Sequence, residues 1–124
     1  MKTKKKLLVL AVLLMVHIAV HADEWIRINQ MGYLPQSIKV AVFMSEEGTQ
    51  LSQFQLVDAY TEKVVRTFHH LKETGILGKM QSTYRLNFSD YNTPGVYYLK
   101  AGCAVSPRFP INAQVYNGSA DFLL

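Results

Sequence analysis

The chain has 124 residues, 13 of them basic and nine acidic, and a formal net charge of +4 at pH 7. Four of the basic residues are lysines within the first six positions, whereas all nine acidic residues follow residue 22. The rest of the chain therefore carries nine charges of each sign, which argues against a nucleic-acid-binding protein. The single cysteine, Cys103, excludes an internal disulfide, and we expect it to be buried as a small apolar residue.

The first 22 residues have the layout of a signal peptide. A lysine-rich start precedes an apolar run from Leu7 to Val16, and Val20-His21-Ala22 offers small or branched residues at the positions that signal peptidase reads. A membrane anchor needs about 20 apolar residues, but His17 interrupts this run and Asp23 follows it. We therefore predict cleavage after Ala22, a secreted or periplasmic protein, and no membrane attachment of the mature chain.

Residues 23–114 are predicted to form one all-β domain. Short segments of alternating or continuous apolar residues are separated by turn signals such as Pro94-Gly95. About seven strands result, and they cover residues 24–29, 38–44, 54–59, 63–68, 83–88, 96–101 and 105–111. Seven short strands in about 100 residues are typical of a β-sandwich, although the strand count alone leaves a barrel open.

Three details of this prediction concern loops and edges. The short turn at residues 60–62 makes its two flanking strands a hairpin. Residues 69–79 lack periodicity and contain two glycines, so we predict a long loop there. Pro107 and Pro110 lie within the last predicted strand, which places that strand at the edge of a sheet.

The segment Asn29-Gln30-Met31-Gly32-Tyr33-Leu34-Pro35 has the residue types of a tightly specified loop. Gly32 permits a backbone conformation that a side chain would forbid, and Pro35 fixes the direction in which the chain leaves. Tyr33 offers a large ring whose hydroxyl needs a partner, and the two amide side chains at the start can bond to backbone groups of the loop. We favour contact with another domain; a ligand site is the alternative.

This segment, followed by Lys39, resembles the opening of the N-terminal immunoglobulin-like domain of family 9 glycoside hydrolases, many of which are cellulases. The resemblance implies an immunoglobulin-like β-sandwich over residues 23–114. Glu62 departs from the pattern, because a turn glycine is expected at this position. Further similarities follow in order: Phe54-x-Leu56-x-Asp58-Ala59, Thr61-x-Lys63-Val64-Val65, Phe88-Ser89-Asp90, Pro94-Gly95-Val96-Tyr97 and Phe109-Pro110-Ile111.

By the same resemblance, residues 115–124 are similar to the linker and first helix of the catalytic (α/α)-barrel that follows this domain in the family. Asn117 or Ser119 would cap a helix that begins near Ala120, and we expect the sequence to stop short of the barrel and its catalytic carboxylates. The chain would then stabilise and orient its own downstream catalytic domain. We expect Tyr33 and Leu34 to form an exposed apolar patch that contacts that domain.

The resemblance also implies what the intact protein does. It would hydrolyse β-glucan-type polysaccharide with inversion, through a carboxylate-activated water. No catalytic, cofactor-binding or metal-binding residue is predicted within this chain. The adjacent pair Glu46-Glu47 precedes Gly48 and is typical of a solvated turn. His69-His70 would point to opposite faces of an extended segment, which is a poor arrangement for chelating a metal.

A carbohydrate-binding module is the main alternative function. Such modules stack sugar rings on exposed flat aromatic side chains, and β-sandwich folds host many functions. A planar row of exposed rings would favour this alternative, whereas buried rings would argue against it. The candidate rings are Trp25, Tyr60, Tyr91, Tyr97 and Tyr98.

Overall fold

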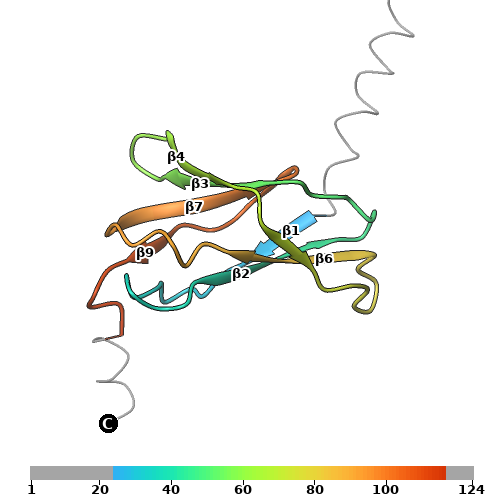
Figure 1. Ribbon diagram of the computed structural model, residues 1–124, viewed down its shortest axis with the longest axis horizontal. Helices are drawn as coiled ribbons and strands as arrows, with labels where there is room; N and C mark the ends of the chain where they lie inside the picture. The colour runs from blue at the N-terminus through green and yellow to red at the C-terminus, as the bar shows by residue number, and fades with distance from the viewer. Residues whose placement is uncertain (1–23, 117–124) are drawn as a thin grey trace, which may run out of the picture.

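The computed structural model describes residues 24–116, which form two antiparallel sheets packed face to face (Figure 1). Sheet A has the strand order β1-β2-β6-β5, and sheet B has the order β4-β3-β7-β8, with β9 also paired to β7. In sheet A the strands are β1 (Glu24–Arg27), β2 (Val40–Ser45), β5 (Leu71–Glu73) and β6 (Ser82–Asn87). In sheet B they are β3 (Phe54–Asp58), β4 (Val64–Phe68), β7 (Gly95–Ala101), β8 (Ala104–Val105) and β9 (Phe109–Ile111).

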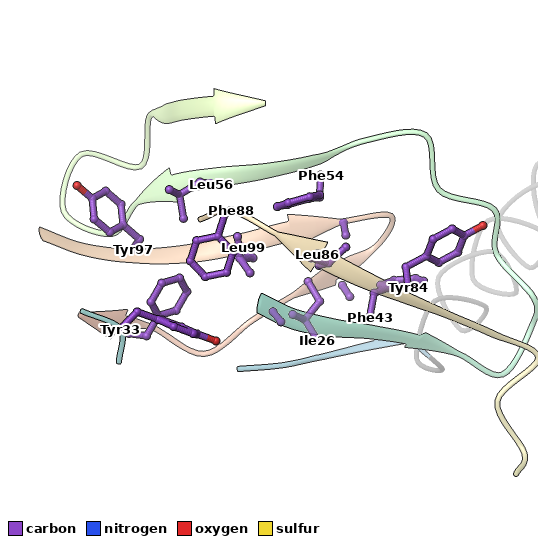
Figure 2. Packing of buried hydrophobic residues seen from close by; sticks show 14 of the residues in the cluster. Ile26, Tyr33, Phe43, Phe54, Leu56, Tyr84, Leu86, Phe88, Tyr97 and Leu99 are labelled. Carbon is purple, nitrogen blue, oxygen red and sulfur yellow. The ribbon is translucent and has the colours of Figure 1, made fainter. Parts of the chain in front are cut away.

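The core lies between the two sheets and is built mainly from alternate residues of the central strands (Figure 2). In β6, Tyr84 and Leu86 are buried whereas Arg85 and Asn87 are exposed, which confirms the predicted alternation. The all-β sandwich prediction is therefore correct, and the barrel alternative is not. The side chains at the centre of the core are at most 1% exposed: Phe43, Phe54, Leu56, Leu86, Phe88, Leu99, Phe109 and Ile111.

Two strand predictions need correction, because the described residues contain nine strands and not about seven. The segment 69–79, predicted as a loop, contains β5, whose Leu71 pairs with Leu86 of β6. Only one of its three residues packs against the core, so no periodicity could reveal it. The predicted strand 105–111 is two strands, β8 and β9, separated around Pro107, which cannot donate to a ladder. Pro110 does lie in an edge strand, as predicted.

Polar groups tie the two sheets together at one end of the sandwich. The Glu24 carboxylate accepts hydrogen bonds from the Thr49 hydroxyl and from the backbone N–H of Cys103, the latter at 2.7 Å. Cys103 is exposed in the tight turn between β7 and β8, so the prediction of a buried cysteine is wrong. Among residues 24–116, every buried side-chain nitrogen or oxygen has a hydrogen-bond partner.

Some sequence predictions concern other parts of the chain. The predicted signal peptide, residues 1–22, and the helix start near Ala120 lie outside the described residues. Between residues 24 and 116, the structure contains no helix long and apolar enough to cross a membrane.

Candidate functional site

The segment Asn29–Pro35 lies in the β1–β2 loop, residues 28–39, beside β9 and the segment 112–116 that follows it (Figure 1). Tyr33 connects these regions through its backbone. Its N–H donates to the carbonyl of Pro110 at 2.9 Å, and its carbonyl accepts from the N–H of Asn112 at 3.1 Å. The loop is therefore fixed to the region in which the chain leaves the sandwich.

Gly32 makes this close approach possible. Its φ is +99°, in the left-handed region, and its N–H donates to the carbonyl of Asn29 at 3.0 Å. A Cβ atom at this position would lie only 2.4 Å from the carbonyl oxygen of Pro110. The prediction that this position needs a glycine is thus confirmed for two independent reasons, conformation and space.

Tyr33 is an internal anchor and is only 5% exposed. Its ring packs edge-on against Phe88 and Phe109, with centroid distances of 5.0 and 5.4 Å (Figure 2). Its hydroxyl donates to the carbonyl of Val40 at 3.0 Å and accepts from the N–H of Asn29 at 2.9 Å. Burial raises the pKa of this phenol above its usual range.

The expectation that Tyr33 forms an exposed patch is therefore wrong. The hydroxyl needs a partner, as the sequence indicated, but it has two, the N–H of Asn29 in the loop and the carbonyl of Val40 in β2, so the ring can be buried. Leu34 and Pro35 are half-buried, whereas Asn29 and Gln30 are exposed. The segment is thus divided into a buried anchor and an exposed rim.

Lys39 closes the loop from inside and has no exposed surface. Its ammonium donates to the carbonyls of Pro35 and Ser37, at 2.6 and 3.0 Å, and to Oδ1 of Asn92 at 3.3 Å. Burial lowers the pKa of Lys39, and the nearby Asp90 carboxylate opposes this shift. Sequence reasoning included Lys39 in the resemblance but assigned it no role, because nothing in the sequence shows that a lysine is buried.

Three apolar or aromatic side chains are exposed on and beside this loop. Met31 is 42% exposed, Ile38 is 81% exposed, and Tyr116 in the segment 112–116 is 38% exposed. The Tyr116 hydroxyl accepts a hydrogen bond from the Asn29 amide at 3.1 Å. We call Met31, Ile38 and Tyr116 the loop surface. An apolar residue type in a polar loop is the signal that could have identified Met31 and Ile38.

A depression of about 400 Å³ lies beside the start of the loop. Gln30 lines it from the loop, and Pro107 lines it from the connection between β8 and β9. Its remaining lining comes from β1 and the residue after it, namely Ile26, Arg27 and Ile28. The loop therefore combines exposed apolar side chains with a neighbouring concave surface, which suits contact with another protein surface.

The structure does not assemble the alternative sites. Across residues 24–116, no group of three or more His, Cys, Asp or Glu side chains is placed to hold a metal ion. The rings of Tyr97 and Tyr98 are buried. Trp25 and Tyr60 are exposed, but Trp25 belongs to sheet A and Tyr60 lies in the β3–β4 turn of sheet B. The candidate rings therefore form no planar row.

The sequence matches the family described as cellulase N-terminal Ig-like domain over residues 21–106. The chain belongs to this family. The immunoglobulin-like sandwich that the resemblance implied is thereby confirmed, together with the recognition of the Asn29–Pro35 segment as its opening. No curated protein matches the chain.

Solved structures agree with this assignment. The chain is similar to a glycoside hydrolase of family 9 from Bacteroides ovatus, with a TM-score of 0.65 and 31% identity. It is also similar to a metagenome-derived endoglucanase of the same family, with a TM-score of 0.65 and 26% identity. A thermostable endoglucanase from Alicyclobacillus acidocaldarius shares the fold, at 22% identity and a TM-score of 0.58 over 75% of this chain and 16% of its own. The first two alignments cover 77% of this chain but only 17% and 19% of those chains.

Proposed function

We propose that this chain is the N-terminal, non-catalytic module of a secreted family 9 glycoside hydrolase, and that it stabilises and orients the catalytic domain. One observation carries the proposal. Met31 and Ile38 have exposed side chains and lie on an ordered loop. The backbone of Tyr33 holds that loop by hydrogen bonds to β9 and to the segment 112–116. A loop that is already ordered loses little conformational entropy when it docks, so its contacts contribute more to net affinity.

The loop surface has the properties of a contact between domains of one chain. Such contacts bury about 600–1,500 Å² and are more polar than obligate interfaces. Met31 and Ile38 supply the apolar part, and a methionine adapts its shape to its partner. Asn29 and Gln30 are exposed beside them and supply hydrogen-bonding groups. The catalytic domain would hydrolyse β-glucan-type polysaccharide with inversion, as the family resemblance implies.

The proposal extends to the ends of the sequence. The signal peptide would be removed during export by cleavage after Ala22, and N-terminal sequencing of the secreted protein should read Asp23 first. Residues 115–124 would lead from the sandwich into the catalytic barrel. The 124-residue chain on its own should not hydrolyse carboxymethylcellulose or short β-glucans.

The docking role is tested in a polypeptide that contains this module followed by its catalytic domain. Met31→Ser with Ile38→Ser should lower the melting temperature of the catalytic domain, because two apolar contacts with the module are lost. Ile76→Ser with Leu77→Ser is the matched control, since these two side chains are 71% and 67% exposed in the loop between β5 and β6. The control should leave the melting temperature unchanged.

Both double variants are also measured in the module alone, where they should have similarly small effects on unfolding. The proposal fails if the loop variant and the control variant melt together in the long polypeptide. Retention of the lone module on insoluble cellulose, with a catalytic domain equally stable without it, would favour the carbohydrate-binding alternative.

A further inference from the structure

The outer face of sheet A carries a row of basic side chains that crosses the sheet from edge to edge. Arg27 of β1 is opposite Val42 of β2, Val42 is opposite Arg85 of β6, and Arg85 is opposite Lys72 of β5. All three basic residues are exposed. The residues on both sides of Arg27 and Arg85, and Leu71 before Lys72, belong to the core or pack against it. Because successive residues of a strand point to opposite faces, the three charges project outward. We call Arg27, Arg85 and Lys72 the cationic row.

Lys72 and Arg85 lie directly opposite each other on strands about 4.8 Å apart. Like charges in this arrangement destabilise an antiparallel pair, so the sheet gains no stability from them. An anionic group bound between them would replace the repulsion with charge-assisted hydrogen bonds. The cationic row also holds three of the nine basic residues that follow residue 22. Positive charge is thus concentrated on this face, although the chain after residue 22 has nine basic and nine acidic residues in total.

A depression of about 440 Å³ lies at the end of the cationic row that Lys72 and Arg85 form. Lys72, Arg85 and Asn87 line it. Their side chains carry N–H donors, and a guanidinium can bind a carboxylate through two parallel hydrogen bonds. None of its lining residues is an aspartate or glutamate. The complete lining is His69, His70, Leu71, Lys72, Arg85 and Asn87.

Trp25 adds an aromatic surface to the same face. It precedes Arg27 by two residues on β1, about 7 Å along the strand, and is 41% exposed. Its partner on β2 is Met44, and its neighbour Ile26 belongs to the core. An exposed indole ring offers a flat apolar surface that suits the face of a sugar ring.

We propose that the cationic row and Trp25 bind an acidic polysaccharide, one that carries uronate carboxylates along its chain. Carboxylates repeated along a polymer match charges on three of the four strands of sheet A. The choice of a polysaccharide over another polyanion rests on the proposed function, a module of a polysaccharide hydrolase, and on Trp25. A neutral β-glucan lacks the carboxylates and should not bind this face.

Trp25 is the only tryptophan of the chain, so its fluorescence reports whether a polymer reaches this face. Titration of the exported chain with polygalacturonate should give a saturable change that weakens as salt is added. Arg85→Gln with Lys72→Gln should weaken binding about tenfold. Lys63→Gln with Lys100→Gln removes the same charge from exposed positions outside sheet A and should leave binding unchanged.

Two further polymers complete the test, poly-L-glutamate of matched charge and neutral hydroxyethylcellulose, and neither should bind comparably. Equal binding of polyglutamate would show a surface for acidic polypeptides and overturn the proposal. Equal weakening by both double variants would show attraction by net charge alone, which also overturns it. Absence of a response to polygalacturonate has the same consequence. None of these results bears on docking to the catalytic domain, which is measured by melting of the long polypeptide.

Discussion

The β1–β2 loop and the β3–β4 turn both contain left-handed backbone, but different contacts hold them. In the loop, the left-handed residue is Gly32, and the chain around it is fixed by bonds to β9, far away in sequence. In the turn, residues 59–63, the carboxylate of Asp58 accepts from the N–H groups of Tyr60 and Thr61 at 2.8 and 3.0 Å. The left-handed residue there is Glu62, with φ +59°.

The difference shows when a glycine is obligatory. At residue 32 another part of the chain occupies the space that a side chain would need, so glycine is required by packing as well as by conformation. The turn is exposed, and only the intrinsic cost of left-handed backbone opposes Glu62. Local hydrogen bonds can offset that cost, and they cannot offset a steric overlap.

The largest expected effect is that of Gly32→Ala. The new Cβ would overlap the carbonyl of Pro110 and force a strained conformation, which should lower the free energy of unfolding by about 2–5 kcal/mol. Gly75→Ala is the control, because Gly75 has φ +94° but no atom within 4 Å of the added Cβ. It should cost only about 1–2 kcal/mol. Equal shifts of the two urea midpoints would contradict the steric part of the comparison.

The next effect concerns the buried anchor of the loop. Tyr33→Phe keeps the ring but removes the hydroxyl that joins Asn29 to Val40, and should cost about 1–3 kcal/mol. Tyr84→Phe is the matched control at the opposite end of the core (Figure 2). Its hydroxyl bonds only to the side chain of exposed Gln50 among the described residues, so the loss should be about 0.5–1 kcal/mol. A smaller loss at residue 33 than at residue 84 would argue against the anchor.

What the sequence could predict follows the same division between local and distant contacts. The alternation in β6, the β3–β4 hairpin, the edge position of Pro110 and the positive φ of Gly32 follow from local residue types, and all are confirmed. The contact that also excludes a side chain at residue 32 comes from the distant Pro110 and could not be predicted. Strand β5 exists because β6 lies beside it, which a three-residue pattern cannot show.

The candidate site was predictable in its location but not in the roles of its residues. The segment Asn29–Pro35 was identified correctly as a specified loop. The burial of Tyr33 and Lys39 depends on Phe109, Asn92 and other residues that are remote in sequence. The exposed apolar side chains of the loop are Met31 and Ile38. Their apolar type was a signal in the sequence, but it does not distinguish them from Leu34, which is half-buried.

A smaller effect of opposite sign is expected in the turn. Glu62→Gly removes the penalty for left-handed backbone, although the unfolded chain gains freedom, and should stabilise the module by about 0.5–1 kcal/mol. Lys63→Gly is the control, since Lys63 does not have a positive φ, and it should destabilise. Thermal melting of both variants measures the contrast. Destabilisation by Glu62→Gly would mean that the glutamate side chain contributes a contact that outweighs the strain.

The smallest effect is a dependence on pH in the same turn. The N–H groups of Thr61 and Tyr60 hold the pKa of the Asp58 carboxyl below its usual 3.8, because both bond to its ionised form. The unfolded chain therefore takes up this proton at a higher pH than the folded chain. The stabilisation that the ionised Asp58 gives the fold is fully present above pH 3.8 and is lost as the pH falls through the folded pKa.

Asp58→Asn keeps an oxygen acceptor but has no proton to take up. Its deficit in melting temperature, relative to the unchanged protein, should therefore be constant at neutral pH and shrink below about pH 4. Glu47→Gln, an exposed carboxylate in another turn, controls for the change in net charge. A deficit for Asp58→Asn that stays constant down to pH 2 would show that the turn does not depend on the charge of Asp58.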